Sequence, residues 1–158
     1  MNEKEVSCAK PIPTRIIAID YGMARIGLAV SDEMKIISTP MVTFPAEKKA
    51  ELTVAKLVAT LRQHEQQNRY KIEVIVMGFP LLMSGKKGLL ADEVTHFAAL
   101  LKEAMDLPVI TWDERLTSVQ ADRSLREGNF SRKKRSQKVD GVAAMIILQN
   151  YLDFRTRI

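Results

Sequence analysis

Three acidic residues of this chain are candidates for a single catalytic centre: Asp20, Glu114 and Asp140. Asp20 and Glu114 stand where short apolar runs stop, and Asp140 opens an apolar helical stripe. Three carboxylates brought together repel one another, and a divalent cation relieves that repulsion. Because Mg²⁺ accepts oxygen ligands and keeps positions for water and phosphate, this set favours metal-assisted hydrolysis of a phosphodiester bond.

Each acid also has an ordinary structural interpretation. Asp20 lies two positions before Gly22 and could form a turn, in which Gly22 can take the positive φ that such turns often need. Asp140 could cap a helix, and Glu114 could be an acid that favours a helix start. The positions of Asp20 and Glu114 at the ends of apolar runs, and the place of Asp140 on the apolar face of a helix, together favour a site over these alternatives. Asp32, at the end of another apolar run, is interpreted as a solvated turn residue.

Alternating apolar runs and helical stripes predict the elements that would position these acids. Residues 15–19 and 26–31 read as a β-hairpin, and later strands alternate with helices. This order predicts an α/β fold with a mixed sheet of five strands flanked by helices, parallel in its second half. The remaining strands are expected at 40–44, 72–77 and 108–112, and the helices at 46–67, 91–106, 116–126 and from about 137 to 154.

The predicted topology brings the acids together. Ligands of open α/β sheets gather outside the carboxyl ends of parallel strands, so Asp20 and Glu114 are expected at one sheet edge. Asp140 would share a helix face with Ala144, Ile147 and Leu148, a stripe that must face the core. In the helix 46–67, the apolar stripe is expected to contain Leu52, Ala55, Val58 and Ala59.

Composition restricts the class of protein. The chain has 158 residues, of which 46% are hydrophobic and 27% charged, as in a one-domain globular protein. We expect a flexible tail at 1–13, one domain at 14–158 and no membrane segment. The lone Cys8 favours the reducing cytoplasm and argues against structural zinc. His64 and His96 lie in predicted helices as structural or exposed residues, so Mg²⁺ or Mn²⁺ is expected.

The formal net charge of +5 permits a nucleic-acid partner. A basic loop precedes Asp140, and further cations lie near the proposed edge; they could clamp a phosphate backbone, although a charge run can equally be a solvated loop. Tyr21 and Phe79 could stack on unpaired bases, whereas core packing is favoured for Trp112. The candidate substrate-binding cations are Arg25, Lys86, Lys87, Arg115, Arg132, Lys133, Lys134 and Arg135.

Four segments resemble the motifs of the YqgF/RuvX family, in the family's order. The similarity extends from about Arg15 to Leu152, nearly the whole expected domain, and four ordered motifs are far more specific than one. The segments are Asp20-Tyr21-Gly22 with Arg25-Ile26-Gly27-Leu28-Ala29-Val30-Ser31-Asp32, Gly78-Phe79-Pro80-Leu81, Asp113-Glu114-Arg115-Leu116-Thr117-Ser118 and Asp140-Gly141-Val142-Ala143-Ala144.

This resemblance implies an RNase H-like fold and a metal-dependent nuclease, a hydrolase that acts on ester bonds. In the family, the acids matching Asp20, Glu114 and Asp140 form the catalytic set. The implied activity is 5′-end maturation of pre-16S rRNA, and an older description is Holliday junction resolvase. The chain departs from the family at Ser84, where a loop aspartate is usual, and two lysines follow after Gly85; contact with substrate through this loop is expected to differ.

Parts of the sequence are also compatible with other functions. A P-loop reading of Gly85-Lys86 fails, because the spacing from Gly78 and the residue after the lysine are wrong. A sugar-kinase or actin-like ATPase shares the core fold but needs a chain well over twice this length. A non-catalytic RNA-binding assembly factor is disfavoured by the three acids, which would repel phosphate without a metal. A junction resolvase needs a symmetric dimer, whereas a monomer can trim RNA, so monomer and homodimer both stay open.

Overall fold

The computed structural model describes residues 9–22, 24–79, 88–113 and 132–156, with the side chains of 89, 90 and 132–140 excepted. Six strands and three helices lie in these ranges. They are β1 (Thr14–Tyr21), β2 (Arg25–Ser31), β3 (Ser38–Pro40), β4 (Phe44–Pro45), α1 (Ala50–Asn68), β5 (Lys71–Phe79), α2 (Leu89–Met105), β6 (Val109–Asp113) and α4 (Arg132–Thr156).

The sheet is mixed, as the sequence predicts. Its main strand order is β3-β2-β1-β5-β6, and the two-residue β4 pairs with β2 beside this path. The hairpin β1–β2 and the β2–β3 pair are antiparallel, whereas β5 runs parallel to both β1 and β6. The parallel strands β1, β5 and β6 therefore end at one edge, called the carboxyl edge below; their other ends form the amino edge.

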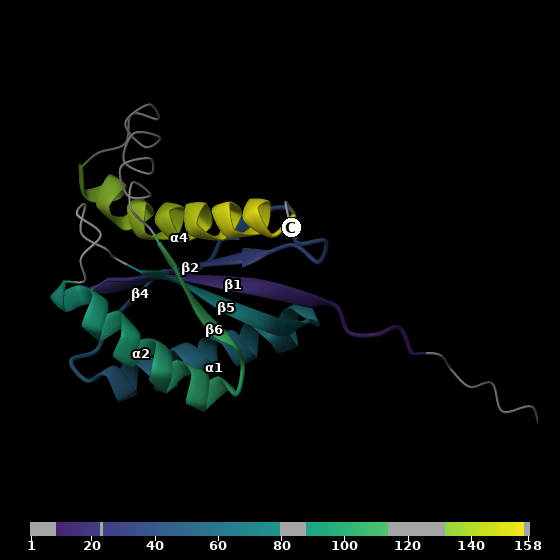
Figure 1. Ribbon diagram of the computed structural model, residues 1–158, viewed down its shortest axis with the longest axis horizontal. Helices are drawn as coiled ribbons and strands as arrows, with labels where there is room; N and C mark the ends of the chain where they lie inside the picture. Colours follow the sequence, from purple (N-terminus) through teal and green to yellow (C-terminus); the bar gives the residue numbers. More distant parts are fainter. Residues whose placement is uncertain (1–8, 23, 80–87, 114–131, 157–158) are drawn as a thin grey trace, which may run out of the picture.

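Helices cover both faces of the sheet. Figure 1 shows α4 above it and α1 and α2 below it. Alternate side chains of β1 go to the two layers: Ile17 and Ile19 join the core under α1 and α2, and Ile16 and Ala18 join the core under α4. This alternation follows from the period of two along a strand, and it fixes the face on which each β1 side chain lies.

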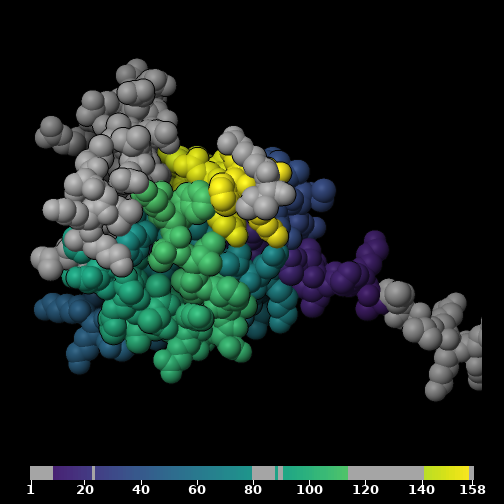
Figure 2. Space-filling model, in the orientation of Figure 1, coloured from purple at the N-terminus to yellow at the C-terminus, as the bar shows by residue number. Residues whose placement is uncertain are grey.

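Helix α4 packs mainly against β2 and β1, and near its end it also reaches the outer strand β6. The ring of Trp112 in β6 contacts Tyr151 at 5.6 Å and Phe154 at 5.2 Å between centroids, both edge-on. In Figure 2 the yellow atoms of α4 meet the green atoms of the β6 region. Trp112 is therefore a packing residue, as predicted. Among the described residues, no helix combines the length and apolar character needed to cross a bilayer.

Three local predictions were wrong. The expected strand 40–44 is instead two short strands, β3 and β4, with Pro45 paired inside β4 opposite Arg25. The segment 132–135, expected as a basic loop, is the start of α4. Helix α1 buries Val54, Leu57 and Leu61, whereas Leu52, Ala55 and Ala59 are exposed and Val58 is half-buried. The helix expected at 116–126 lies outside the described residues.

Candidate active site

Asp20 lies at the carboxyl edge, one residue before β1 ends. Ile19 pairs with Met77 of β5, and Gly78 pairs with Trp112 of β6, so the ends of three parallel strands stand level with Asp20. Its side chain is half-buried and shares the parity of Ile16 and Ala18, which places it on the face that α4 covers. A carboxylate is thus held at the edge where ligands of such sheets bind.

The turn after Asp20 is built on close backbone contact. The amide of Gly22 donates to the carbonyl of Arg25 at 2.9 Å, and a Cβ at position 22 would stand 2.5 Å from that oxygen. The φ of Gly22 is outside the left-handed region, so the structure needs glycine here for space and not for a positive φ. Arg25, a predicted substrate cation, begins β2 directly after this turn, at the carboxyl edge.

Tyr21 anchors the end of β1 from the opposite face. Its ring lies 4.8 Å from that of Phe97 in α2, tilted by 44°. Burial, and secondarily the negative charge of Glu93, raises the pKa of Tyr21, so its hydroxyl stays protonated at neutral pH. Phe79 is likewise half-buried and packs against the core under α1 and α2. These rings are packed against the protein, and stacking of either on a base stays a prediction.

Helix α4 brings the backbone of Asp140 to the same end of the sheet. The adjacent Gly141 is buried, and a Cβ there would meet Pro40 Cβ and Thr43 Oγ1 at 3.8 Å. The chain just after Pro40 is hydrogen-bonded to Leu28, which pairs with Ile19 of β1, one residue before Asp20. The predicted stripe is confirmed, because Ala144, Ile147 and Leu148 are fully buried.

The other predicted site residues are described only in part. Glu114 follows the last residue of β6 and lies outside the described residues, as do Lys86, Lys87 and Arg115. The cations at 132–135 and the acid at 140 are placed by the helix backbone alone. Among the described side chains, no three of His, Cys, Asp and Glu gather as a metal site. Convergence of the three acids is therefore still a prediction.

Residues predicted to be structural are confirmed as such. Asp32 Oδ1 accepts hydrogen bonds from the amides of Ile36 at 2.7 Å and Ile37 at 3.0 Å, and these bonds lower the pKa of Asp32. His64 Nδ1 lies 2.7 Å from the Tyr70 hydroxyl, and burial, aided by the charge of Arg15, lowers the pKa of His64. His96 is exposed.

Solved structures of two resolvases have the same fold. Thermus thermophilus RuvC in complex with a Holliday junction substrate aligns with a TM-score of 0.52 and 16% identity, over 90% of this chain and 96% of RuvC. The fowlpox virus resolvase in its Holliday junction complex gives a TM-score of 0.52 and 13% identity, over 89% and 98% of the chains. The chain therefore has an RNase H-like fold, with Asp20 at the carboxyl edge of its sheet.

Sequence relatives identify the particular group. A family model described as "RuvX: Holliday junction resolvase" matches residues 14–154. A protein from Protochlamydia amoebophila named "Putative pre-16S rRNA nuclease" is 58% identical over 146 residues, covering 92% of this chain and 97% of the relative. One of the same name from Koribacter versatilis is 42% identical over 141 residues, covering 89% and 88%. The chain belongs to the RuvX (YqgF) family, a family of nucleases.

Proposed function

We propose that this protein is a divalent-metal-dependent nuclease that matures the 5′ end of pre-16S rRNA by hydrolysing phosphodiester bonds. The observation that carries the proposal is the position of Asp20: half-buried, under α4, at the edge where β5 and β6 also end. The substrate is inferred from the curated relatives, which bear the name of pre-16S rRNA nucleases and match over nearly their whole length.

Asp20, Glu114 and Asp140 are proposed as the catalytic carboxylates. Ile110 and Trp112, which precede Glu114 at alternate positions, both pack toward α4. The acid at 140 immediately precedes Gly141, which is buried near the carboxyl edge. Strand alternation and helix position therefore both support placing the three acids between the sheet and α4.

These carboxylates would hold Mg²⁺ or Mn²⁺. An oxygen-only donor set suits hard cations, and the described histidines are exposed or engaged with the core, which leaves none at this edge for zinc. When bound, such an ion supplies activation of a water nucleophile and neutralisation of charge at the phosphate. The backbone contact of Gly22 and the ring of Tyr21 hold the end of β1, and so keep Asp20 in a fixed position.

The basic residues are proposed to position the phosphate backbone. Arg25 starts β2 at the carboxyl edge, and the four cations of 132–135 lie on α4 about one to two turns before Asp140. Arg115, Lys86 and Lys87 would extend this surface. Contacts of this kind orient the substrate without reading its sequence, and they make binding depend strongly on salt.

A second candidate activity is cleavage of four-way DNA junctions, favoured by the description of the matching family model. Symmetric nicking of a junction requires two active sites, and hence a homodimer, whereas trimming of RNA requires only a monomer. A non-catalytic RNA-binding assembly factor is the third alternative. We place the protein in the cytoplasm, where precursor rRNA occurs and where a lone Cys8 stays reduced.

Cleavage of two labelled substrates tests the proposal: a 5′ precursor fragment of 16S rRNA and a four-way DNA junction, each with Mg²⁺, Mn²⁺ or EDTA. We expect metal-dependent cutting of the RNA, and a loss of at least about 100-fold in Asp20→Asn, because a ligand of the ion is removed. Asp32→Asn is the matched control. This variant changes another aspartate at the end of a strand. The amide oxygen of the new asparagine can still accept the hydrogen bonds that the Ile36 and Ile37 amides donate to Asp32 Oδ1.

Three outcomes would contradict the proposal. Cutting of the junction alone would assign the resolvase activity and require a dimer. RNA binding without cutting of either substrate would favour the assembly factor. Equal cleavage by Asp20→Asn and Asp32→Asn would remove Asp20 from the catalytic set.

A further inference from the structure

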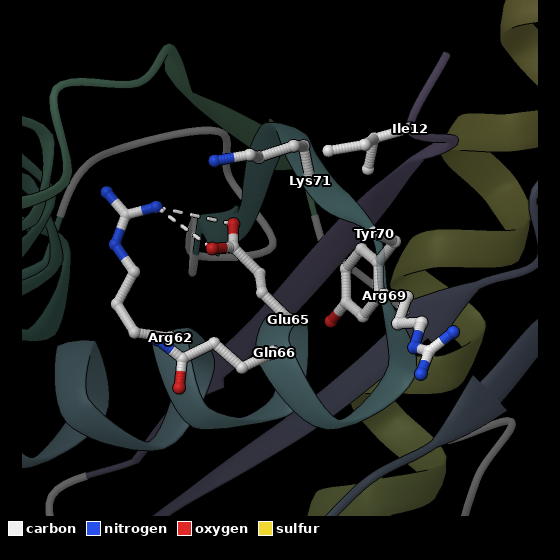
Figure 3. Close-up of a pocket in the computed structure, with 7 residues that line it drawn as sticks. All are labelled: Ile12, Arg62, Glu65, Gln66, Arg69, Tyr70 and Lys71. Atoms are coloured by element: carbon white, nitrogen blue, oxygen red, sulfur yellow. Dashed lines mark hydrogen bonds and ion pairs between the residues drawn. The ribbon is translucent and has the colours of Figure 1, made fainter. Parts of the chain in front are cut away.

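A second group of cations lies at the amino edge, away from Asp20. A depression of about 650 Å³ is formed there by the end of α1 and the start of β5, and Figure 3 shows its lining. Lys71 begins β5 and pairs with Thr14 of β1. From Lys71 to Gly78, which stands level with Asp20, the strand extends seven positions, or about 23 Å.

The one acid of this depression is already neutralised. Glu65 is 7% exposed, and its carboxylate accepts hydrogen bonds from Arg62 Nη1 at 3.1 and 3.3 Å and from the Ile72 amide at 2.9 Å. Arg62 Nη2 donates a hydrogen bond to the carbonyl of Met105 in α2 at 3.0 Å. Arg62 and Glu65 thus form a fixed, neutral floor that ties α1 to β5 and α2.

Arg69 and Lys71 leave an excess of two positive charges at the rim. Both are exposed, and neither makes an ion pair within the described part of the chain. In Figure 3 the two side chains diverge: Lys71 extends over Glu65 and Arg62, and Arg69 points to the other side. The charges are therefore spread across the depression and do not converge on one point.

The floor offers no face for a base to stack on. Tyr70 is 2% exposed, its ring lies 5.1 Å beneath the guanidinium of Arg15, and its hydroxyl contacts His64. The lining also has an exposed aliphatic side chain, Ile12, but the groups in it that can recognise a polyanion are the charged Arg69 and Lys71.

The backbone gives no reason for an arginine at position 69. Arg69 ends α1 in the left-handed conformation, with φ 52° and ψ 58°, and its amide donates to the Glu65 carbonyl. Glycine or asparagine usually occupies this position, because a Cβ strains the left-handed region. Lys35 and Asp106 have the same left-handed conformation, so the position alone does not distinguish Arg69, and the inference depends on its exposed charge.

We propose that this depression is a second contact for the phosphate backbone of the RNA substrate, independent of sequence and about 23 Å from the edge where cleavage is proposed. The inference rests on the proposed function, since it takes RNA as the ligand. Diverging cations fit successive phosphates of a strand, whereas a single bound anion would need donors that converge.

Salt-dependent RNA binding tests this contact. The protein carries Asp20→Asn so that the precursor fragment stays intact, and affinity is measured from 50 to about 300 mM salt. We expect Arg69→Gln/Lys71→Gln to reduce the slope of log affinity against log salt by about 1.4, or about 0.7 for each lost phosphate contact on a single strand. Lys71→Gln alone should reduce the slope by about 0.7, half of the effect of the double substitution.

Two variants separate the contact from net charge and from folding. Lys102→Gln removes one charge at the same end of the molecule, from a depression that it shares with Glu103 and Asp106, and should leave the slope unchanged. Arg69→Gly should weaken RNA binding while the midpoint of thermal unfolding stays equal or rises, because glycine relieves the left-handed conformation. A protein that loses affinity without losing stability is not misfolded.

The outcomes are distinguishable from failure of the proposed function. The second contact would be overturned, with RNA binding intact, if the parent and the Arg69→Gln/Lys71→Gln protein had equal salt slopes. It would also be overturned if Lys102→Gln reduced the slope as much as Lys71→Gln does. Competition by millimolar inorganic phosphate that requires Arg69 and Lys71 would replace it with a single-anion site. Absence of RNA binding in the parent, with junction DNA still bound, would overturn both.

Discussion

At the scale of single residues, the two glycines that follow the proposed catalytic acids differ in how much space the backbone leaves for a side chain. Gly22 follows Asp20 closely, and a Cβ there collides with the Arg25 carbonyl at 2.5 Å. Gly141 follows Asp140, and a Cβ there makes ordinary contacts of 3.8 Å. The sequence presents both simply as glycine after an acid, and only the backbone shows which one has no room for a side chain.

We expect Gly22→Ala to destabilise the fold by about 1–3 kcal/mol, because the added methyl forces the β1–β2 turn to move. The same shift displaces Asp20, so cleavage should fall more than stability explains. Urea unfolding and precursor cleavage, measured on the same preparation, test this.

Gly141→Ala is the matched control. It should leave the free energy of unfolding unchanged or raise it by up to about 1 kcal/mol, since alanine favours a helix interior over glycine. If both variants unfold at the same urea concentration, the close contact at position 22 does not constrain the turn.

At the scale of elements, α4 positions one proposed acid and also closes the core, and the sequence predicts its buried stripe but not its start at Arg132. Its buried stripe of Ala144, Ile147 and Leu148 has a clear helical period. The stripe of α1 was predicted on the wrong residues, although Val54, Leu57 and Leu61 repeat with helical spacing; the buried face also includes the polar Thr53 and Glu65. In the buried state, Thr53 Oγ1 accepts a hydrogen bond from the Glu47 amide and the Glu65 carboxylate accepts from Arg62, and local periodicity reveals neither bond.

The aromatic contact between β6 and α4 should contribute to how firmly the end of that helix packs. Trp112→Ala removes both edge-on contacts, with Tyr151 and Phe154, and we expect a loss of roughly 3 kcal/mol, at the low end for tryptophan because the ring is only half-buried. Chemical denaturation followed by circular dichroism measures it.

Trp112→Phe should recover most of that stability, because a smaller ring still packs against the helix. If Trp112→Ala were as stable as the parent, packing would not be the role of Trp112, and stacking on an unpaired base would be the favoured role.

At the scale of the whole molecule, Glu73 joins three distant parts of the chain at the amino edge. Its carboxylate accepts from the Thr14 hydroxyl at 3.0 Å and Arg155 Nη2 at 3.1 Å, and Lys35 Nζ lies 3.2 Å away.

The mixed sheet and the shared edge of β1 and β6 were predictable from alternating patterns. This network around Glu73 was not, because its members lie up to 141 positions apart, 155 against 14.

Glu73 should make stability depend on pH in the acid range. Burial raises the pKa of Glu73, but the hydrogen bonds from Lys35 and Thr14 and the nearby positive charges outweigh it, so the pKa lies below its ordinary 4.5. The ionised form therefore stabilises the fold. This contribution is complete above pH 4.5 and is lost as the pH falls through the lowered value.

Urea unfolding of the parent and Glu73→Gln from pH 7 to pH 3 tests this sign. We expect the parent to be more stable at neutral pH and the difference to shrink below about pH 4.5. A difference that stays constant over this range would show that ionisation of Glu73 does not contribute.

The Glu73 network has a further consequence for how the chain can be reconnected. Thr14 opens the first strand and Arg155 lies at the end of the last helix, yet both hydrogen-bond the same side chain. A linker of a few residues could therefore join residue 14 to residue 155, with new termini opened in an exposed turn outside the Glu73 network. Such a circular permutant would keep the carboxyl edge, with Asp20 and the start of α4, in its native arrangement.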